Sequence, residues 1–477
     1  MVRKITPASE DYSQWYTDVV QTAEMADYSP VRGCMVIRPY GYALWENVQQ
    51  GLDRRFKATG HQNAYFPLFI PESFIRKEAQ HVEGFSPELA VVTHGGGKEL
   101  EEPLIVRPTS ETIINSMYAK WIQSYRDLPL LINQWCNVVR WEMRTRLFLR
   151  TTEFLWQEGH TAHATAQEAR EETMRMLEVY RDFAENDAAI PVIPGRKSDS
   201  EKFAGAVDSY SIEAMMGNKW ALQAGTSHFL GQNFAKAFGT QFLDENNEMQ
   251  FVWQTSWGVS TRMVGAIVMV HGDDQGLRLP PRLAPVQVVV VPIWKSDDQR
   301  ASVMAVAQDV TQALGTAFRC KLDDREGVSP GFKFNDWEMR GVPLRIELGP
   351  RDVEKNQAVL VRRDLARKEN KSTAKLEALS AAVGEQLEAI QGNLFAQASC
   401  FLQDNTSEPQ TYGALREAVE DGFALAYWCG SVDCEAKVKD DTKATIRCIP
   451  LNQGKEPGRC VCCGEPATEK AVFARAY

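Results

Sequence analysis

Charged residues interrupt two apolar runs in the first half of the sequence. The stretch NVVRWE (137–142) contains Arg140 and Glu142, and LRTTEF (149–154) contains Arg150. If the first run is a strand, Arg140 and Glu142 lie on one face of it. Charges in half-buried positions are unfavourable unless they are paired or bind a ligand. Two interpretations follow: a ladder of internal ion pairs, or a site where arginines bind phosphate oxygens and glutamates bind an amino group or a divalent metal.

Two further stretches place polar side chains among small or apolar residues. GVSTRMVG contains Arg262, directly before a run with helical character, and LQAGTSHFLG contains Gln223, Thr226 and His228. A single histidine in an apolar run is more often a hydrogen-bonded core residue than a ligand, so both roles stay open for His228. Arg262 adds another cation to the possible phosphate site.

Two glycine-rich motifs suggest a serine hydrolase, but their details exclude it. HGGG (94–97) resembles an oxyanion loop, and GVSPG (327–331) matches the G-x-S-x-G nucleophile elbow. The residue after Ser329 is Pro330, which has no N–H to donate to an oxyanion. The charged DDRE, rather than a buried strand, precedes the motif. We therefore reject the hydrolase hypothesis.

The HGGG segment is better explained as the tip of a β-hairpin. The apolar, β-branched runs LAVVTH and PLIVRP flank GGGKELEE, so that Gly95–Gly97 form a flexible turn. The second strand ends in RPTSET, which contains Thr109 and Glu111. Because loops at strand ends often carry binding groups, these two residues are candidates for a ligand site.

Two close pairs of cysteines lie near the end of the sequence and have the spacing of a zinc site. They are Cys429, Cys434, Cys460 and Cys463. Four thiolates supplied by two turns are typical of a closed, structural zinc site. Buried structural thiols and a redox pair are alternatives, and Cys448 or Cys462 could replace one ligand. Ten cysteines without an export signal favour reduced thiols or metal ligands over disulfides.

Composition predicts an ordinary globular protein. Of 477 residues, 44% are hydrophobic and 24% are charged. The net charge of −10 argues against nucleic acid as a partner, although VRRDLARKENK (361–371) could form a local basic patch or simply a solvated face. The longest apolar run, VQVVVVPIW, is far shorter than the ~20 residues that span a bilayer. We expect a cytoplasmic protein without membrane contact.

The order of the expected elements predicts an α+β protein with three domains. Up to residue 281, strands do not alternate regularly with helices, which favours an antiparallel sheet with helices packed on it. Prolines in LRLPPRLAPVQ mark a boundary, and in 282–385 strands alternate with helices, as in a small parallel or mixed sheet. The cysteine-bearing segment 386–477 is the third domain. Since Walker A and G-x-G-x-x-G motifs are both absent, any nucleotide must be bound by another device.

Several of these stretches resemble the signature motifs of class II aminoacyl-tRNA synthetases. GHQNAYFPLF is similar to motif 1, with Pro67 at the dimer interface, VVRWE and FLRTTEF are similar to motif 2, and GVSTRMVG is similar to motif 3. RPTSET, EKFAGA, GTSHFLGQNF and GFKFNDWEMRGVPLRIELGPRD resemble the prolyl-tRNA synthetase family in particular, over nearly the whole chain. The cysteine tail and Tyr477 resemble its archaeal and eukaryotic type. The interval between motifs 2 and 3 is too short for the inserted editing domain of typical bacterial members.

The resemblance implies an activity, an architecture and partners. Proline would attack the α-phosphate of ATP, with Mg²⁺ bound, to give prolyl-adenylate and pyrophosphate, and tRNA(Pro) would then take the prolyl group and release AMP. The architecture would be a class II catalytic domain (1–281), an anticodon-binding domain (282–385) and a small zinc-bearing domain (386–477). A cytoplasmic homodimer is expected.

The resemblance also assigns roles to residues. The catalytic residues would be Arg140, Glu142 and Arg262. Proline would contact Thr109, Glu111, Arg140, Trp156, Phe203, His228 and Trp257. ATP would contact Arg140, Glu142, Arg150, Thr151, Gln223, Thr226, Ser260 and Arg262. The anticodon would contact Glu338, Arg340, Arg345 and Glu347, and structural zinc would be held by Cys429, Cys434, Cys460 and Cys463.

Parts of this assignment have simpler, purely structural explanations. The aromatic residues could be ordinary core residues, and the anticodon set could be surface ion pairs of little energetic value. The whole chain could be a tRNA-binding regulator without activity, or a sister enzyme for another amino acid. Because one methylene group is worth only ~1–3 kcal/mol of discrimination, alanine or cysteine could be activated in error.

Overall fold

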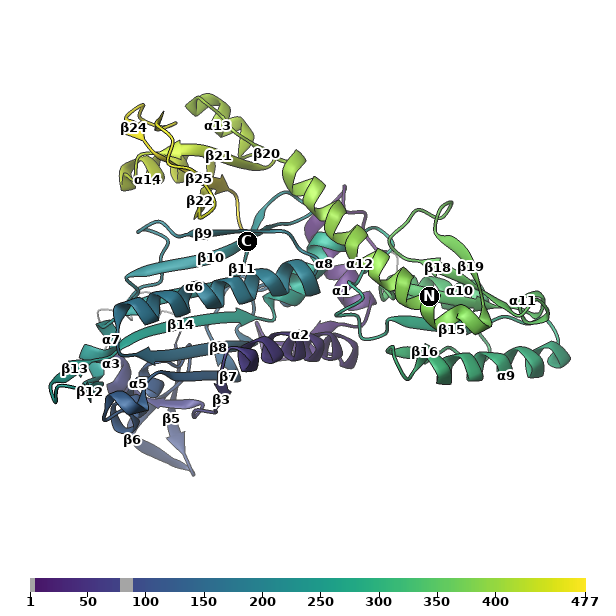
Figure 1. Ribbon diagram of the computed structural model, residues 1–477, viewed down its shortest axis with the longest axis horizontal. Coiled ribbons are helices and arrows are strands. Elements are labelled where there is room, and N and C mark those ends of the chain that lie inside the picture. Colours follow the sequence, from purple (N-terminus) through teal and green to yellow (C-terminus); the bar gives the residue numbers. More distant parts are fainter. Residues whose placement is uncertain (1–4, 78–88) are drawn as a thin grey trace.

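The computed structural model describes residues 5–77 and 89–477, and its largest element within them is a sheet of eleven strands (Figure 1). In order across the sheet these are β20 (Thr406–Ser407), β21 (Phe423–Trp428), β25 (Glu469–Ala474), β22 (Thr445–Pro450), β9 (Val192–Arg196), β10 (Asp208–Met215), β11 (Ala221–Gly231), β14 (Trp253–Ser260), β8 (Glu153–His163), β7 (Leu130–Val139) and β3 (Gln62–Asn63). The two outermost pairs are parallel, and every other neighbouring pair is antiparallel. The antiparallel sheet expected for the first domain is confirmed.

Helices with one apolar face cover this sheet. In α6 (Ala166–Asp182), Met176, Leu177 and Tyr180 are buried at helical spacing. Its start is set by a capping box, in which Thr165 and Glu168 bond each other's backbone N–H. Figure 1 shows α6 lying along the strands. The other elements around the sheet are α1 (Tyr12–Thr22), β1 (Ala26–Tyr28), β2 (Met35–Ile37), α2 (Pro39–Ala58), α3 (Glu72–Lys77), α5 (Glu111–Trp121), η2 (Tyr125–Asp127), η3 (Phe183–Asp187), α7 (Asn233–Phe238), β12 (Gln241–Leu243), β13 (Met249–Phe251) and α8 (Arg262–His271).

The expected hairpin is present and belongs to a small sheet of three strands. This sheet has the order β4 (Phe69–Pro71), β6 (Lys98–Val106) and β5 (Ala90–Gly95). Gly96 and Gly97 form the turn with φ of +59° and +80°, a conformation that favours glycine. The KELEE segment, expected in the loop, lies in β6. After β6 the chain passes through 107–110 into α5, which begins at Glu111.

The second domain contains a mixed sheet, as predicted. Its order is β16 (Cys320–Leu322), β15 (Val288–Pro292), β17 (Leu344–Leu348), β18 (Gln357–Arg362) and β19 (Lys371–Lys375), with β15 parallel to both of its neighbours. Its helices are α9 (Asp297–Leu314), α10 (Pro330–Met339), α11 (Pro350–Glu354), η4 (Leu376–Ala378) and α12 (Leu379–Asp404). Ser329 of the GVSPG motif caps α10, because its hydroxyl accepts a hydrogen bond of 3.2 Å from the N–H of Phe332. The motif therefore starts a helix.

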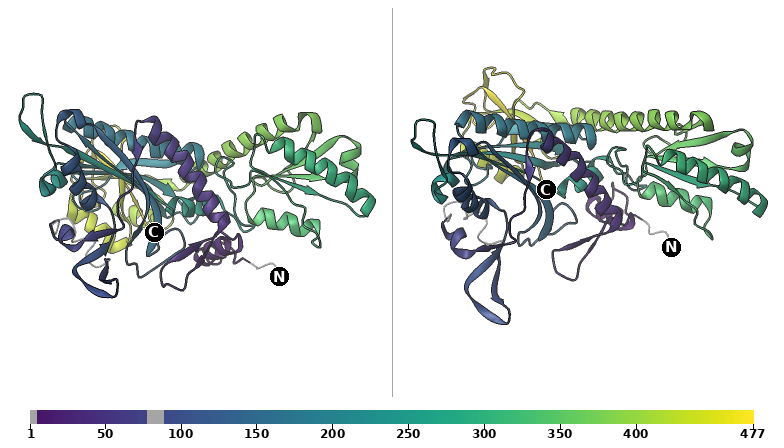
Figure 2. Two further views of the ribbon diagram at one scale, coloured as in Figure 1. Left: turned by 90° about the horizontal axis from the view of Figure 1, so that it is seen from below. Right: turned by 60° about the horizontal axis from the view of Figure 1, so that its bottom comes forward.

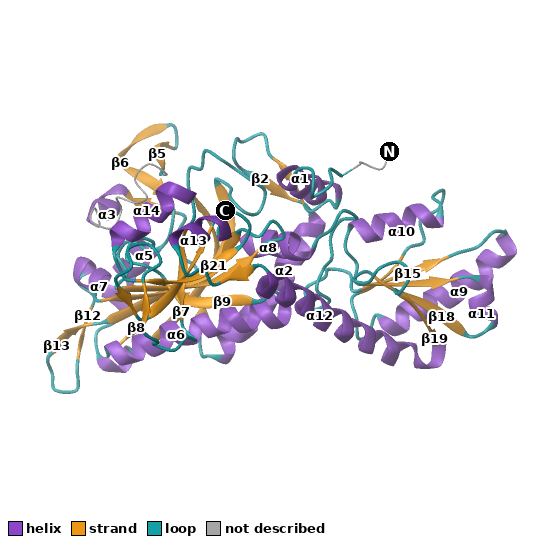
Figure 3. Ribbon diagram, turned by 90° about the horizontal axis from the view of Figure 1, so that it is seen from above, coloured by secondary structure: helices purple, strands orange, loops and turns teal. Residues whose placement is uncertain are grey.

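Helix α12 connects the second domain to the cysteine-bearing region (Figure 2). Its first half packs in the core of the second domain through Leu379, Val383, Leu387 and Ile390. The boundary expected between residues 385 and 386 falls inside this helix. Figure 3 shows the larger and the smaller sheet as two separate bodies.

The cysteine-bearing region extends the sheet of the first domain directly. Its strand β22 pairs with β9 through Ile449 opposite Arg196 and Pro450 opposite Gly195. The remaining elements of this region are α13 (Tyr412–Ala418), α14 (Val432–Thr442), β23 (Gly458–Arg459) and β24 (Pro466–Ala467). No helix in the described part of the chain is long and apolar enough to cross a membrane.

Candidate active site

Cross-strand register places polar side chains side by side on one face of the large sheet. His160 of β8 lies opposite Ser256 of β14, Ser256 lies opposite His228 of β11, and His228 lies opposite Ser209 of β10. These four residues border a cavity of about 230 Å³. Of the residues singled out in the sequence, the cavity is also bordered by Thr109, Glu111, Arg140, Trp156, Phe203, Gln223, Thr226 and Trp257. All seven residues expected at a proline site therefore border one cavity, although the ring of Trp257 lies on the other face of the sheet.

A buried carboxylate lies at one end of the cavity. The side chain of Glu111, at the start of α5, is only 5% exposed and accepts a hydrogen bond from the hydroxyl of Thr109. Ser110 anchors the loop between them, since its N–H and hydroxyl both donate to Glu158. A buried anion is stabilised by a nearby cation, and this end of the cavity suits an ammonium group.

Glu158 and His160, which were not singled out in the sequence, lie close to Glu111. The ring Nε2 of His160 lies 3.0 Å from an oxygen of Glu158, and Gln134 donates to the same carboxylate at 3.0 Å. Burial alone would lower the pKa of His160, but the hydrogen bond to Glu158 and the charge of Glu111 raise it above its usual value. Burial would raise the pKa of Glu158, yet the bonds from His160, Ser110 and Gln134 lower it.

This pairing sets the charge of the site. With His160 protonated, one of the two carboxylates is neutralised and one negative charge remains. Glu111, Glu158 and His160 have their ligand atoms within 4.8 Å of one another, the separation of a metal site. Glu158 already bonds Ser110, Gln134 and His160, so the arrangement favours a single ammonium group at Glu111. The E-x-H spacing in the strand WQEGHT was the sequence signal for this pair.

His228 forms one wall of the cavity as a neutral ring. Ser209 Oγ accepts a hydrogen bond from the N–H of Phe203 at 3.0 Å, so its own proton can be donated to His228 Nδ1 at 2.8 Å. The His228 proton is then assigned to Nε2. Burial, followed by the charges of His160 and Lys197, lowers the pKa of His228 to about 3. The ring of Phe203 lies 5.0 Å from it, so that both rings form an uncharged wall.

Trp257 borders the cavity, but its indole ring lies on the opposite face of the sheet. It packs against Phe56 and His61, each 5.0 Å away, and is 1% exposed. Strand alternation explains this, because Ser256 and Gly258 face the cavity and the residue between them faces away. A Cβ atom at Gly159 would lie 2.0 Å from the ring, so glycine is required beneath it. The expected role of Trp257 as a wall of the ring pocket has no support, whereas Trp156 does face the cavity side, where Arg140 lies 5.4 Å from its ring.

Further arginines lie near Arg140, which borders the cavity. Arg140 Nε donates to the carbonyl of Pro108 at 2.9 Å, and Arg262 Nε donates to that of Leu149 at 3.2 Å. Arg150 pairs with Glu142 at 3.1 Å. Burial, followed by the charges of Arg140 and Arg150, lowers the pKa of Arg262 to about 10.

Such a convergence of cations is stabilised when an anion binds. Three guanidinium groups with mutual repulsion offer the forked donors that match phosphate oxygens. Of the ion-pair ladder considered from the sequence, the pair between Arg150 and Glu142 is formed. The arrangement as a whole therefore favours the polyanion site.

The strand expected to carry Arg140 and Glu142 is shorter than predicted. β7 ends at Val139, opposite Glu153, the first residue of β8, so Arg140 and Glu142 lie in the loop beyond the sheet. The expectation that both share one strand face was wrong. The hydroxyl of Thr151 donates to Glu153 O, and the hydroxyl of Ser260 accepts from Arg262 N.

The residues expected to read the anticodon do not all lie together in the structure. Arg345 lies 3.1 Å from Glu338 and 3.0 Å from Glu347, beside a cavity of about 270 Å³ that Glu338 and Arg345 border. The basic segment 361–371 also borders this cavity, through Arg362, Arg363, Arg367 and Asn370 among others. Arg340 lies apart and pairs instead with Glu24 of the first domain.

The four expected cysteines form one cluster. Their sulfur atoms all lie within 4.8 Å of one another, and Cys429 Sγ is 3.8 Å from Cys434 Sγ and 3.7 Å from Cys463 Sγ. A tetrahedron with zinc–sulfur distances of ~2.3 Å has edges of about 3.8 Å, so the donor set fits zinc. Burial opposes thiolate formation at Cys460, but hydrogen bonds at the Cys463, Cys462 and Cys429 backbone lower its pKa to about 7. Cys448 is buried elsewhere, against Gly195.

Three family models match the chain. They are "tRNA synthetase class II core domain (G, H, P, S and T)" at residues 92–271, "Anticodon binding domain" at 287–386 and "Prolyl-tRNA synthetase, C-terminal" at 412–477. A proline–tRNA ligase of Roseiflexus castenholzii is 57% identical over 475 residues, covering 99% of each chain. One of Chlorobium phaeobacteroides is 59% identical over 485 residues, covering 100% of each. The chloroplastic/mitochondrial proline–tRNA ligase of Arabidopsis thaliana is 58% identical over 480 residues, covering 100% of this chain and 88% of the relative.

Proposed function

The chain belongs to the prolyl-tRNA synthetase family, and from this premise we propose how its residues carry out the reaction. The protein is an enzyme that ligates proline to tRNA in an ATP-dependent reaction. This sets aside an inactive regulator and an enzyme for another amino acid. The proposed course has two steps: prolyl-adenylate and pyrophosphate form first, and the prolyl group then passes to the terminal hydroxyl of tRNA(Pro) with release of AMP.

The observation that carries this proposal is the polarity of the cavity, which is bordered by the buried carboxylate of Glu111 and by Arg140, with Arg262 and Arg150 converging near Arg140. Thr109 and Glu111 would bind the secondary ammonium of proline, and Trp156, Phe203 and His228 would surround its ring. Arg140 would lie between the carboxylate of proline and the α-phosphate of ATP, because a forked donor can bridge two anions. The amino acid would then point its carboxylate at the phosphate.

No protein nucleophile is needed for this chemistry. Arg262, with Arg150 and Thr151 beside it, would bind the triphosphate and offset the charge that develops at the α-phosphate. Gln223, Thr226 and Ser260 would add hydrogen bonds to the nucleotide. Mg²⁺, when bound, would neutralise phosphate charge, and Glu142 and Gln223 are the residues we propose to hold it.

At the second site, we propose that Glu338, Arg345 and Glu347 read anticodon bases, whose unstacked edges can bond Arg and Glu side chains. The adjacent basic segment 361–371 would contact the phosphate backbone. Arg340, expected to belong to this set, is better assigned to the junction between the domains because of its pair with Glu24.

We further propose a cytoplasmic homodimer of three domains with the boundaries expected from the sequence, 1–281, 282–385 and 386–477, where helix α12 runs across the last boundary. Around Pro67 the large side chains of Tyr65 and Phe69 are 71% and 44% exposed, beside the edge strand β3, which supports a dimer interface there. Zinc at the four cysteines would be structural, since a closed four-thiolate set leaves no coordination position for substrate.

The test is amino-acid-dependent exchange of pyrophosphate into ATP. The panel contains proline, alanine, cysteine, threonine and histidine. Exchange with proline far above the others would support the proposed pocket, and exchange with alanine or cysteine would measure misactivation. Exchange with proline that survives both Glu111→Gln and Arg140→Met would refute the assignment of the pocket.

A further inference from the structure

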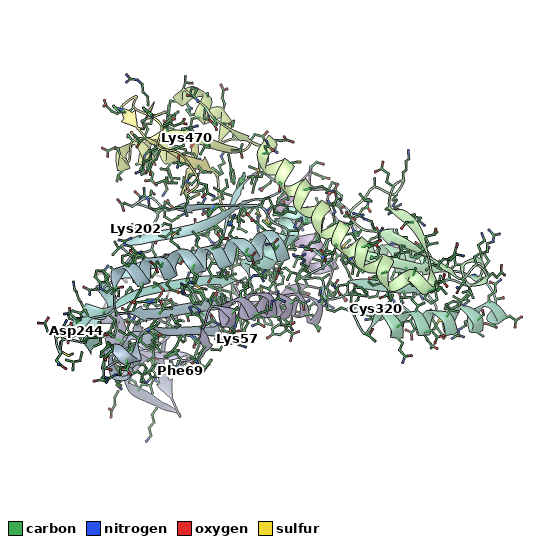
Figure 4. The ribbon with its side chains drawn as sticks, in the orientation of Figure 1. Lys57, Phe69, Lys202, Asp244, Cys320 and Lys470 are labelled. Atoms are coloured by element: carbon green, nitrogen blue, oxygen red, sulfur yellow. The ribbon has the colours of Figure 1, made fainter. Side chains whose placement is uncertain are left out.

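One wall of the proposed proline pocket is a loop that contacts the C-terminal region. Residues 197–203, here called the pocket loop, border the cavity through Lys197, Glu201, Lys202 and Phe203. The loop follows β9, the strand that pairs with β22. Figure 4 labels Lys202 on the side of the first domain nearest the C-terminal region, in which Lys470 is labelled. The loop thus lies between the pocket and the last domain.

Two buried hydrogen bonds and a weaker ion pair join this loop to the C-terminal domain. Lys197 Nζ donates to the backbone carbonyl of Arg447 in β22 at 2.7 Å. Ser198 Oγ donates to Glu435 of α14 at 2.6 Å, and both of these residues are at most 5% exposed. Glu201 lies 3.9 Å from Lys439, also of α14. Lys197 and Glu201 therefore take part both in the wall of the cavity and in the contacts with the C-terminal domain.

A buried carboxylate shared between both domains reinforces the first contact. Glu213 of β10 is fully buried and accepts from Arg447 Nη2 at 3.1 Å and from Arg447 Nε at 3.2 Å. Lys197 Nζ lies 3.5 Å from the other oxygen, which also accepts from Ser211 at 2.8 Å. Because two cations share one carboxylate, Arg447 leaves Lys197 free to bond the carbonyl and to face the pocket.

We propose that Arg447 and Glu435 are positioning residues for the amino-acid site, through which the C-terminal domain holds the pocket loop, including Phe203, against bound proline. This inference rests on the proposed proline pocket. Without the guanidinium of Arg447, the buried Glu213 has Lys197 as its remaining cation among these contacts. The ammonium group then moves toward Glu213, and the loop that carries Phe203 follows. Affinity for proline falls, whereas the arginines around the triphosphate keep their places.

The experiment compares Arg447→Met with Arg475→Met in the full-length protein. Arg475 lies in the same domain, and its side chain contacts Glu420 and Thr442 within that domain. Pyrophosphate exchange gives KM and kcat for proline and for ATP, and thermal unfolding is recorded for each variant. We expect Arg447→Met to raise the KM for proline about tenfold with a much smaller change in the KM for ATP. Arg447→Lys should restore most of the loss, and Arg475→Met should match the wild type.

A second variant covers the case in which Arg447→Met does not fold. Ser198→Ala removes the bond to Glu435 without leaving a buried carboxylate next to a missing cation, and it should also raise the KM for proline. A lowered melting temperature with an unchanged KM for proline in the folded variants would overturn the inference, as would an equal effect of Arg475→Met. Wild-type protein is measured first, because lack of exchange with proline there would refute the proposed function instead.

Discussion

Glu24 and Arg340 form an ion pair that joins the first domain to the second. Their side chains are 2.5 Å apart, and Arg38 lies 2.9 Å from the same carboxylate. Tyr40 donates to the backbone carbonyl of Arg340 at 2.7 Å. The bond from Arg340 is the main cause that lowers the pKa of Glu24, so this carboxylate is ionised at neutral pH. Arg340 therefore acts at a domain junction, apart from the cluster around Arg345.

Replacing Arg340 should separate these two roles. Arg340→Met removes a partly exposed ion pair and should lower stability by only about 0.2–1 kcal/mol. We expect a reduced rate of tRNA charging with unchanged pyrophosphate exchange and unchanged preference among tRNA anticodon variants. Arg345→Met, the matched comparison, should weaken that preference. A loss of anticodon preference in Arg340→Met would return Arg340 to the reading set.

The carboxylate of Glu111 should dominate proline binding. Glu111→Gln keeps the shape of the side chain but removes the charge that a secondary ammonium needs. Removing one partner of a buried charge pair costs about 2–5 kcal/mol, so kcat/KM for proline should fall by about thirtyfold or more in the exchange assay. Glu101→Gln, at an exposed position of β6, is the control and should have no effect. Equal kcat/KM values in the two variants would contradict the assignment.

His228 should make the protein less stable in acid. Its folded pKa of about 3 lies below the ordinary value of 6.5, so the unfolded chain binds the proton more tightly. The stability that it contributes is present above about pH 6.5 and is lost as pH falls from there toward 3. His228→Gln should therefore flatten the dependence of melting temperature on pH in that window. His94→Gln, an exposed control, should leave the slope as in the wild type.

His160 should change the pH dependence of stability in the direction opposite to that of His228. Its pKa is raised in the folded state, so the stability contributed by its bond to Glu158 is present below the unfolded value and is lost as pH rises through the folded one. Loss of the imidazolium leaves two adjacent carboxylates beside bound proline. We expect the KM for proline to change on this alkaline limb, and His160→Gln should abolish that change. A limb that persists in the variant would assign it to another group.

Metal content should depend on four cysteines and not on their neighbour. Cys460→Ser should reduce bound zinc from one ion per chain to well below one and should lower the melting temperature, because a structural zinc site contributes directly to folding. Cys462 lies two positions after Cys460 and outside the cluster, so Cys462→Ser should retain the metal. Elemental analysis of the purified variants measures both. Retention of zinc by Cys460→Ser would exclude this thiol as a ligand.

Features encoded by local pattern were predictable from the sequence, whereas those that depend on cross-strand register were not. β-Branched runs around glycines placed Thr109 and Glu111 at a strand end, and two cysteine pairs indicated the cluster of four cysteines. The alternation in WQEGHT could have pointed to Glu158 and His160, but their partner Glu111 comes from a different element. Strand alternation predicts that Trp257 and Ser256 face opposite sides of the sheet. Which of the two faces holds the pocket is decided by packing of α6 and its neighbours.

The shared sheet has a consequence for how the chain acquires its fold on the ribosome. β9 pairs with β22, about 250 positions later, so the two meet only after the whole second domain has been synthesised. Contacts between such distant segments form slowly, and until then the edge of β9 presents unpaired backbone groups. The nascent catalytic domain is therefore a folding intermediate with an open strand edge. When β22 emerges from the ribosome, it can pair with this edge of β9.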